Sequence, residues 1–142
     1  MGKLQILVLG ILALVFFSPD LSAQSRGKRE TSEKIKAAES VQVYYFHYTR
    51  RCKTCNAVES QTKKALQELY AKQMQAGKIT FASVNLEEPE GKRIGDSIGV
   101  KSQSLLVVSG DQQYDLTDKA FLYATTNPDK LKLELQKAIG KR

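Results

Sequence analysis

The chain of 142 residues contains two cysteines, Cys52 and Cys55, with two residues between them. A disulfide between such close neighbours closes a very small loop, so it stabilises a fold little through chain entropy. Exported domains that depend on disulfides for stability usually carry several pairs. The pair is therefore better explained by reactivity, because two thiols at this spacing can exchange with a thiol or disulfide of another molecule.

The residues around the cysteines predict a buried strand that leads into a helix. Residues 41–48 carry β-branched and aromatic side chains on both faces, which is typical of a strand buried on both sides. Residues 52–75 place apolar side chains at helical spacing, and Ala76-Gly77 ends the helix. Cys52 is then expected at the helix N-terminus, where free N–H groups and the helix dipole stabilise a thiolate.

This position predicts different roles for the two thiols. Cys52 is expected to be the exposed nucleophile, and Cys55, one turn further in, the buried thiol that resolves a mixed disulfide. Arg50, Arg51 and Lys53 add positive charge beside Cys52. We expect this charge to lower the pKa of the Cys52 thiol further, although solvent screens part of the effect.

The remaining segments predict an α/β fold with a central mixed β-sheet flanked by α-helices. In order they are a strand at 79–86, a short helix that starts at 87–89 and stops at Gly99, strands at 104–108 and 112–116 joined at Gly110-Asp111, and a last helix capped by Asn127 with Pro128 at its first position. Residues 118–126 show no clear pattern. Such an order places helices on both faces of the sheet.

From residue 41 to about residue 140 the chain resembles the thioredoxin family. The resemblance rests on the strand leading into Cys52-Lys53-Thr54-Cys55, on 84–88 (Val-Asn-Leu-Glu-Glu) and on 98–101 (Ile-Gly-Val-Lys). A CxxC spacing alone is a weak signal, but at a strand-to-helix turn with the later elements in family order it is a strong one. The resemblance implies a thioredoxin-like fold, with the first two strands parallel and the third antiparallel to the first. It also implies a thiol–disulfide oxidoreductase whose catalytic residues are Cys52 and Cys55.

Several positions depart from the family pattern. Arg51 replaces the usual aromatic residue before the first cysteine, and Lys53-Thr54 replaces the frequent Gly-Pro. Phe46 stands where many members have a buried Asp that helps to move protons. Ser104 stands where most members have a cis-proline that shapes the substrate groove and keeps metal from the thiols. The resemblance places that groove along Arg51, Gln103 and Ser104.

The departures leave two other functions open. One is a non-catalytic binding or adaptor module on the same fold, and the other is a thiol protein that binds a soft metal ion such as Cu(I). A structural zinc site needs about four ligands, which two thiols and the lone His47 do not supply within one chain. We expect His47 to be a packed strand residue. The exchange reaction itself requires no cofactor, because the two sulfurs carry the electrons.

The charge of the chain does not indicate a nucleic-acid partner. The 22 Lys and Arg residues exceed the 15 Asp and Glu residues and give a net charge of +7. Such a balance suits anionic partners in general, but here the cations are scattered, and the densest cluster, at 26–29, lies in an expected polar segment. The expected partners are protein thiols or disulfides, and the expected oligomeric state is a monomer.

Residues 1–23 are typical of a secretory signal peptide. Lys3 gives a positive start, Leu4–Phe17 is a mainly apolar run, and a small residue, Ala23, follows the helix-breaking Ser18-Pro19. The run is shorter than the ~20 residues of a membrane span, although an uncleaved anchor is the alternative. The predicted organisation is a signal peptide at 1–23, a polar segment and helix at 24–40, and a thioredoxin-like domain at 41–142. The expected location is periplasmic or extracellular, with no membrane attachment after cleavage.

Export predicts a processed chain. The mature protein should begin at or near Gln24, because the pattern of residues 1–23 ends in a cleavable small residue. N-terminal sequencing of the protein recovered from outside the cytoplasm measures this directly. An intact Met1 on that protein would contradict the prediction.

Overall fold

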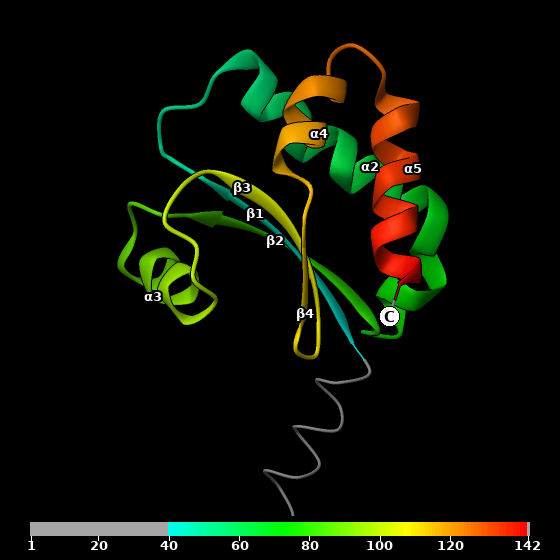
Figure 1. Ribbon diagram of the computed structural model, residues 1–142, viewed down its shortest axis with the longest axis horizontal. Helices are drawn as coiled ribbons and strands as arrows, with labels where there is room; N and C mark the ends of the chain where they lie inside the picture. The colour runs from blue at the N-terminus through cyan, green and yellow to red at the C-terminus, as the bar shows by residue number, and fades with distance from the viewer. Residues whose placement is uncertain (1–39, 142) are drawn as a thin grey trace, which may run out of the picture.

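The computed structural model describes residues 40–141, so the expected signal peptide at 1–23 and all but the last residue of the expected polar segment and helix at 24–40 lie outside the described residues. The described chain forms β1 (Val41–His47), α2 (Lys53–Gln75), β2 (Ile79–Asn85), α3 (Pro89–Ser97), β3 (Ser104–Ser109), β4 (Gln112–Asp115), α4 (Thr117–Tyr123) and α5 (Pro128–Gly140) (Figure 1). None of the helices within 40–141 is both long enough and apolar enough to cross a membrane.

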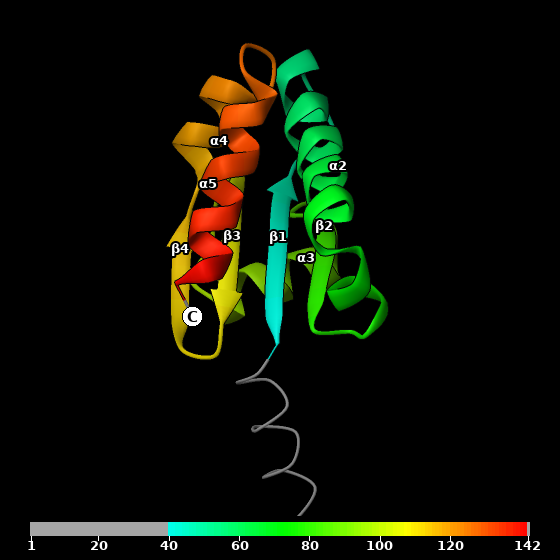
Figure 2. The same ribbon diagram turned by 90° about the vertical axis from the view of Figure 1, so that its right-hand side faces the viewer.

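The four strands form one mixed sheet in the order β2-β1-β3-β4. Strand β2 runs parallel to β1, and β3 runs antiparallel to it, as the sequence predicted. Helices α2, α4 and α5 cover one face of the sheet, and α3 covers the other (Figures 1 and 2). The predicted α/β fold, a central mixed sheet with helices on both faces, is therefore confirmed.

Strand β1 lies at the centre of this arrangement and is buried on both faces. Val41, Val43 and Tyr45 belong to the larger core beneath α2, α4 and α5. Phe46 belongs to a second core cluster on the face covered by α3. Because side chains alternate between the two faces of a strand, both faces of β1 must be apolar, which is the pattern that residues 41–48 showed.

Two features differ from the sequence analysis. The segment that showed no clear pattern overlaps the short helix α4, which packs through Ala120 and through the two capping residues, Leu116 and Ala124, all buried. Two of these three side chains are alanines, so the apolar periodicity is weak. Helix α2 has the predicted extent, but it is interrupted at Tyr70, where φ is −135° and ψ is 24°.

Two positions of helix α3 have no room for a side chain, one against the end of β2 and one against the segment that follows the helix. A Cβ atom at Gly91 would lie 1.8 Å from the backbone oxygen of Asn85, and one at Gly95 would lie 2.8 Å from the backbone oxygen of Val100. Both contacts involve backbone atoms, which cannot move aside as a flexible side chain can. Gly91 thus allows the close approach of α3 to β2, and Gly95 allows the chain after α3 to fold back against the helix.

This packing predicts that Gly91→Ala destabilises the protein. The added methyl group must push α3 away from Asn85, and overpacking of this kind costs about 1–3 kcal/mol. Urea unfolding followed by circular dichroism measures the change. Gly140→Ala in α5 is the matched control, because a Cβ atom there would meet nothing within 4 Å and alanine favours helix. Equal unfolding midpoints for the two variants would contradict the close packing of α3.

Candidate active site

Cys52 and Cys55 lie where the loop after β1 enters α2. Cys52 is the N-cap residue of the helix, with extended backbone angles (φ −83°, ψ 167°), and its side chain is exposed. Cys55 is buried, with 6% of its surface accessible. The two residues are joined by a disulfide, and their Cα atoms are 5.0 Å apart. The predicted difference in exposure between the two sulfurs is confirmed.

The sulfur of Cys52 takes the place of an N-capping oxygen. The backbone N–H of Cys55 donates a hydrogen bond to Sγ of Cys52 at 3.0 Å. The first turn of α2 contains no acidic residue, so no side chain there offsets the positive end of the helix dipole. When the disulfide opens, the same N–H group and dipole are in place to stabilise a thiolate on Cys52.

The loop between β1 and α2 is held against the end of β2. The carboxylate of Glu87 accepts a hydrogen bond from the backbone N–H of Thr49 at 2.6 Å. The side-chain amide of Asn85 donates to the hydroxyl of Thr49 at 2.9 Å, and the backbone N–H of Leu86 donates to the carbonyl of His47 at 2.8 Å. These bonds fix the approach to Cys52. They were not predicted from the sequence, although polar residues directly after a parallel strand are a signal for such contacts.

Arg51 does not act as a free cation beside Cys52, which corrects the sequence analysis. Its guanidinium pairs with Glu59 of α2 and lies over the ring of Tyr45, 5.5 Å from the ring centroid. Lys63 reaches the same carboxylate from one turn further along, at 2.6 Å. Because Glu59 balances its charge, Arg51 contributes less to the positive potential at Cys52 than expected.

Glu59 stays ionised in this setting. Burial by itself would raise its pKa, but hydrogen bonds from Lys63 and Arg51 outweigh burial and lower the pKa to about 2. The side chain of Glu59 is 15% exposed and that of Arg51 is 23% exposed, so the pair is largely shielded from solvent. Glu59 was not among the site residues expected from the sequence. Its position four residues before Lys63 on a helix was the available signal.

The three residues expected along the groove lie at the same end of the sheet as Cys52. The side-chain amide of Gln103 donates to the hydroxyl of Tyr45 at 2.7 Å, so Gln103 and Arg51 contact the same ring residue. Burial raises the pKa of Tyr45, and the bonds to Gln103 and Arg51 oppose that rise. Ser104 starts β3 and pairs with Phe46 of β1, while its hydroxyl donates to the carbonyl of Ser102 at 2.8 Å.

His47 and Phe46, the other two positions discussed from the sequence, are packed against neighbouring residues. His47 is partly buried, with Nδ1 3.0 Å from the carbonyl oxygen of Tyr48 and its ring 5.7 Å from that of Tyr45. Phe46 is fully buried in the cluster that also contains Val84 and Leu106. The position where many thioredoxins have a buried acid is thus filled here by a ring packed beneath α3.

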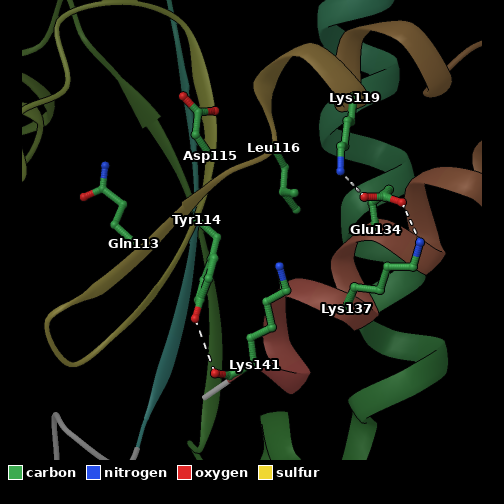
Figure 3. Close-up of a pocket in the computed structure, with 9 residues that line it drawn as sticks. Gln113, Tyr114, Asp115, Leu116, Lys119, Glu134, Lys137 and Lys141 are labelled. Carbon is green, nitrogen blue, oxygen red and sulfur yellow. Dashed lines mark hydrogen bonds and ion pairs between the residues drawn. The ribbon is translucent and has the colours of Figure 1, made fainter.

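A hollow lies away from the cysteines, between β4 and α5 (Figure 3). Its walls carry Lys119 and Lys137, which both pair with Glu134, and Tyr114, whose hydroxyl donates to the carbonyl of Lys141 at 3.3 Å. None of the residues expected to form the active site or the groove lines it. The hollow is therefore separate from the candidate active site.

The low pKa of Glu59 predicts a pH-dependent contribution to stability. A carboxylate with a depressed pKa stabilises the folded state above its ordinary pKa of 4.5, and this contribution is lost as the pH falls from 4.5 to about 2. Glu59→Gln should therefore lower the free energy of unfolding at pH 7 by about 1–3 kcal/mol, because Arg51 loses its partner. The difference from wild type should shrink at pH 3.

Urea unfolding at the two pH values measures this. Glu90→Gln is the matched control, because Glu90 pairs with Arg93 in an exposed position where ion pairs contribute little. A Glu59→Gln variant as stable as wild type at pH 7 would show that the pair with Arg51 does not support the fold.

Comparison with known proteins finds similarity in structure only. No protein-family model matches the sequence, and no curated protein matches it. The solved structure of oxidised thioredoxin O2 from Arabidopsis thaliana is similar with a TM-score of 0.50 at 15% identity, over 78% of this chain and 87% of that chain. A thioredoxin from Trypanosoma brucei brucei gives a TM-score of 0.44 at 15% identity, over 78% of this chain and 85% of that chain. The structure of a malarial protein gives a TM-score of 0.45 at 19% identity, over 70% of this chain and 97% of that chain.

The similarity to the Arabidopsis structure agrees with the sheet order and with the helices on both faces. A disulfide at CxxC spacing, with one sulfur exposed at a helix N-terminus, supports thiol–disulfide exchange in general. With its mixed four-stranded sheet and with Cys52 and Cys55 at the start of α2, this chain has a thioredoxin-like fold.

Proposed function

We propose that this protein is an exported thiol–disulfide oxidoreductase that exchanges disulfides through Cys52-Lys53-Thr54-Cys55. The observation that carries the proposal is the setting of the two sulfurs. Cys52 is an exposed residue whose Sγ accepts a hydrogen bond from the N–H of Cys55 at 3.0 Å, while Cys55 is buried and bonded to it. One sulfur is accessible to a partner, and the other is shielded from competing reactions.

The exchange reaction is balanced by the two sulfurs alone. A thiolate of the partner attacks Sγ of Cys52, the bond between Cys52 and Cys55 breaks, and Cys55 leaves as a thiolate. The partner's second thiolate then attacks the partner sulfur that is bonded to Cys52, and Cys52 is released as a thiolate. The partner loses two electrons and forms a disulfide, and the two cysteines gain those electrons. The reverse sequence reduces a partner's disulfide, with Cys52 as nucleophile and Cys55 as resolving thiol.

The surroundings of Cys52 favour its thiolate form. The N-terminus of α2 supplies a partial positive charge, and Arg50 and Lys53 are exposed cations close to Cys52 in the chain. Arg51 adds less, because Glu59 neutralises it. Stabilising the thiolate of the reduced form makes the disulfide easier to reduce and therefore a stronger oxidant.

The remaining parts of the proposal concern location and partners. The pattern of residues 1–23 supports export to the periplasm or the cell exterior. An oxidising compartment of that kind suits a protein that supplies or rearranges disulfides. The proposed partners are protein thiols or disulfides, and the proposed active species is a monomer without a cofactor.

The proposed function predicts a reactive thiol at Cys52. In the Cys55→Ser variant, the pH dependence of iodoacetamide labelling should give Cys52 a pKa below the ~8.5 of a free thiol. A glutathione redox titration of the wild-type protein should give a potential above the value of about −270 mV known for thioredoxin. Purified protein should also accelerate the reduction of insulin disulfides, and Cys52→Ser should abolish that activity.

Glu59→Gln is an internal test of the electrostatic argument. Loss of the carboxylate leaves the charge of Arg51 unbalanced next to Cys52, so the thiol pKa should fall further in a Glu59→Gln, Cys55→Ser double variant. A Cys52 pKa at or above the ~8.5 of a free thiol, in both the Cys55→Ser variant and the double variant, would contradict the proposed oxidoreductase function. The binding-module alternative would then lead, and titration of the reduced protein with Cu(I) would test the metal-binding alternative.

A further inference from the structure

Three exposed cations at the Cys52 end of the sheet have no ion-pair partners of their own among the described residues. Arg50 and Lys53 flank Cys52 in the chain, and Lys101 belongs to the loop that enters β3. None of the three forms an ion pair with any residue in 40–141. Arg51, by contrast, is paired with Glu59 and partly buried. The uncompensated charge at this end is therefore on side chains that an approaching molecule meets first.

The cations come from two loops that meet at one residue. Arg51, next to Arg50, lies over the ring of Tyr45, and Gln103, two residues after Lys101, donates to the hydroxyl of the same tyrosine at 2.7 Å. The strand register agrees, because the start of β3 pairs with the end of β1. In Figure 1 the loop that follows β1 and the loop that precedes β3 lie at the same end of the sheet. Positive charge thus lies on both loops beside Cys52.

Carboxylates near this end offset part of the positive charge. Glu59 is bound by Arg51 and Lys63. Glu87 accepts the N–H of Thr49 at 2.6 Å and Glu88 lies 3.3 Å from the side-chain amide of Asn85, and neither forms an ion pair with a described residue. The first turn of α2 has no acidic residue, so the positive end of the helix dipole adds to the potential. A cluster of exposed charges of one sign attracts oppositely charged partners and raises their association rate.

We propose that this end of the molecule recognises acidic segments of a polypeptide that flank the partner's reactive cysteine. The inference rests on the proposed function and names its substrate class. The cations lie at the same end of the sheet as a disulfide, and only a ligand with a sulfur atom can exchange with that disulfide. An acidic stretch of protein beside a cysteine carries both a thiol and several anionic groups, whereas nucleic acids and lipids carry the anions without the thiol. Exposed Tyr48 lies in the same loop as Arg50 and offers an apolar contact to such a segment.

The test compares three dithiol peptides that differ only in having Glu, Gln or Lys around the first cysteine. Each peptide reduces the oxidised protein, and acid quenching followed by mass spectrometry of alkylated thiols gives the rate constant. Each rate is divided by that of the same peptide with hydroxyethyl disulfide, because flanking charges also alter the peptide's own thiol. At ~0.01 M salt the Glu peptide should react about tenfold faster than the Gln peptide, and the Lys peptide slower. At ~1 M salt the three should converge.

Paired variants show whether the preference comes from this surface. Arg50→Gln with Lys101→Gln removes one cation from each loop and avoids the residues between the cysteines. The control is Lys72→Gln with Lys78→Gln, which removes the same charge from exposed residues at the far end of α2, where the backbone of Lys78 meets the start of β1. The ratio of Glu-peptide to Gln-peptide rates should fall severalfold in the first variant and stay at the wild-type value in the control.

The outcomes separate this inference from the proposed function. Equal normalised rates for the three peptides, with exchange still occurring, would overturn the acidic-segment inference and leave the oxidoreductase standing. No exchange with any peptide would overturn the oxidoreductase and the inference together. Binding to vesicles rich in phosphatidylserine, abolished by Arg50→Gln with Lys101→Gln and accompanied by no peptide preference, would assign the surface to anionic lipid instead.

Discussion

The hydrogen bond from the N–H of Cys55 to Sγ of Cys52 holds the exposed sulfur at the positive end of α2, and the rest of the site is arranged around it. The bond requires that the chain leave β1 and start a helix within a few residues. Strand β1 makes this possible, because it is paired on both edges and packed on both faces. A strand fixed on four sides ends at a defined point, and the bonds of Thr49 to Asn85 and Glu87 then fix the loop.

The cations near Cys52 fall into two groups with different physical roles. Arg51 is partly buried, and a charge in that position is costly unless it is paired, so Glu59 and the ring of Tyr45 compensate it. Arg50, Lys53 and Lys101 are exposed, and water stabilises them without a protein partner. Only the second group offers charge to an incoming molecule. Basic side chains thus support the fold at one position and are open to solvent at others.

The departures from the usual thioredoxin pattern are accommodated by local packing. Phe46 fills the position of the buried acid with a ring in the cluster beneath α3, so no charge is buried there. The hydroxyl of Ser104 is satisfied by the carbonyl of Ser102, and its backbone continues the pairing with β1. Gln103 is held to β1 by its bond to Tyr45. Side-chain hydrogen bonds therefore fix the segment that leads into β3.

What the sequence by itself determined were the properties that depend on near neighbours in the chain. Burial of β1 on both faces, the start of α2 at Cys52, the hairpin at Gly110-Asp111 and the cap at Asn127 follow from periodicity and turn chemistry, and the structure has them. The different exposure of the two sulfurs follows from their places on a helix. Helix α4 was missed because its inner face is built mostly of alanines, which give a weak periodic signal.

Only the tertiary structure decided which groups neutralise or hold one another. Gln103 meets Tyr45 across 58 residues of chain, and Thr49 meets Glu87 across 38. The pairing of Arg51 with Glu59 spans 8 residues, from a loop to a helix, and depends on the angle at which the chain enters α2. Electrostatic effects fall off with distance in space and depend on burial, and neither quantity is set by residue spacing alone. For that reason the sequence predicted which cysteine is exposed, whereas the folded chain determined which of the neighbouring cations are paired.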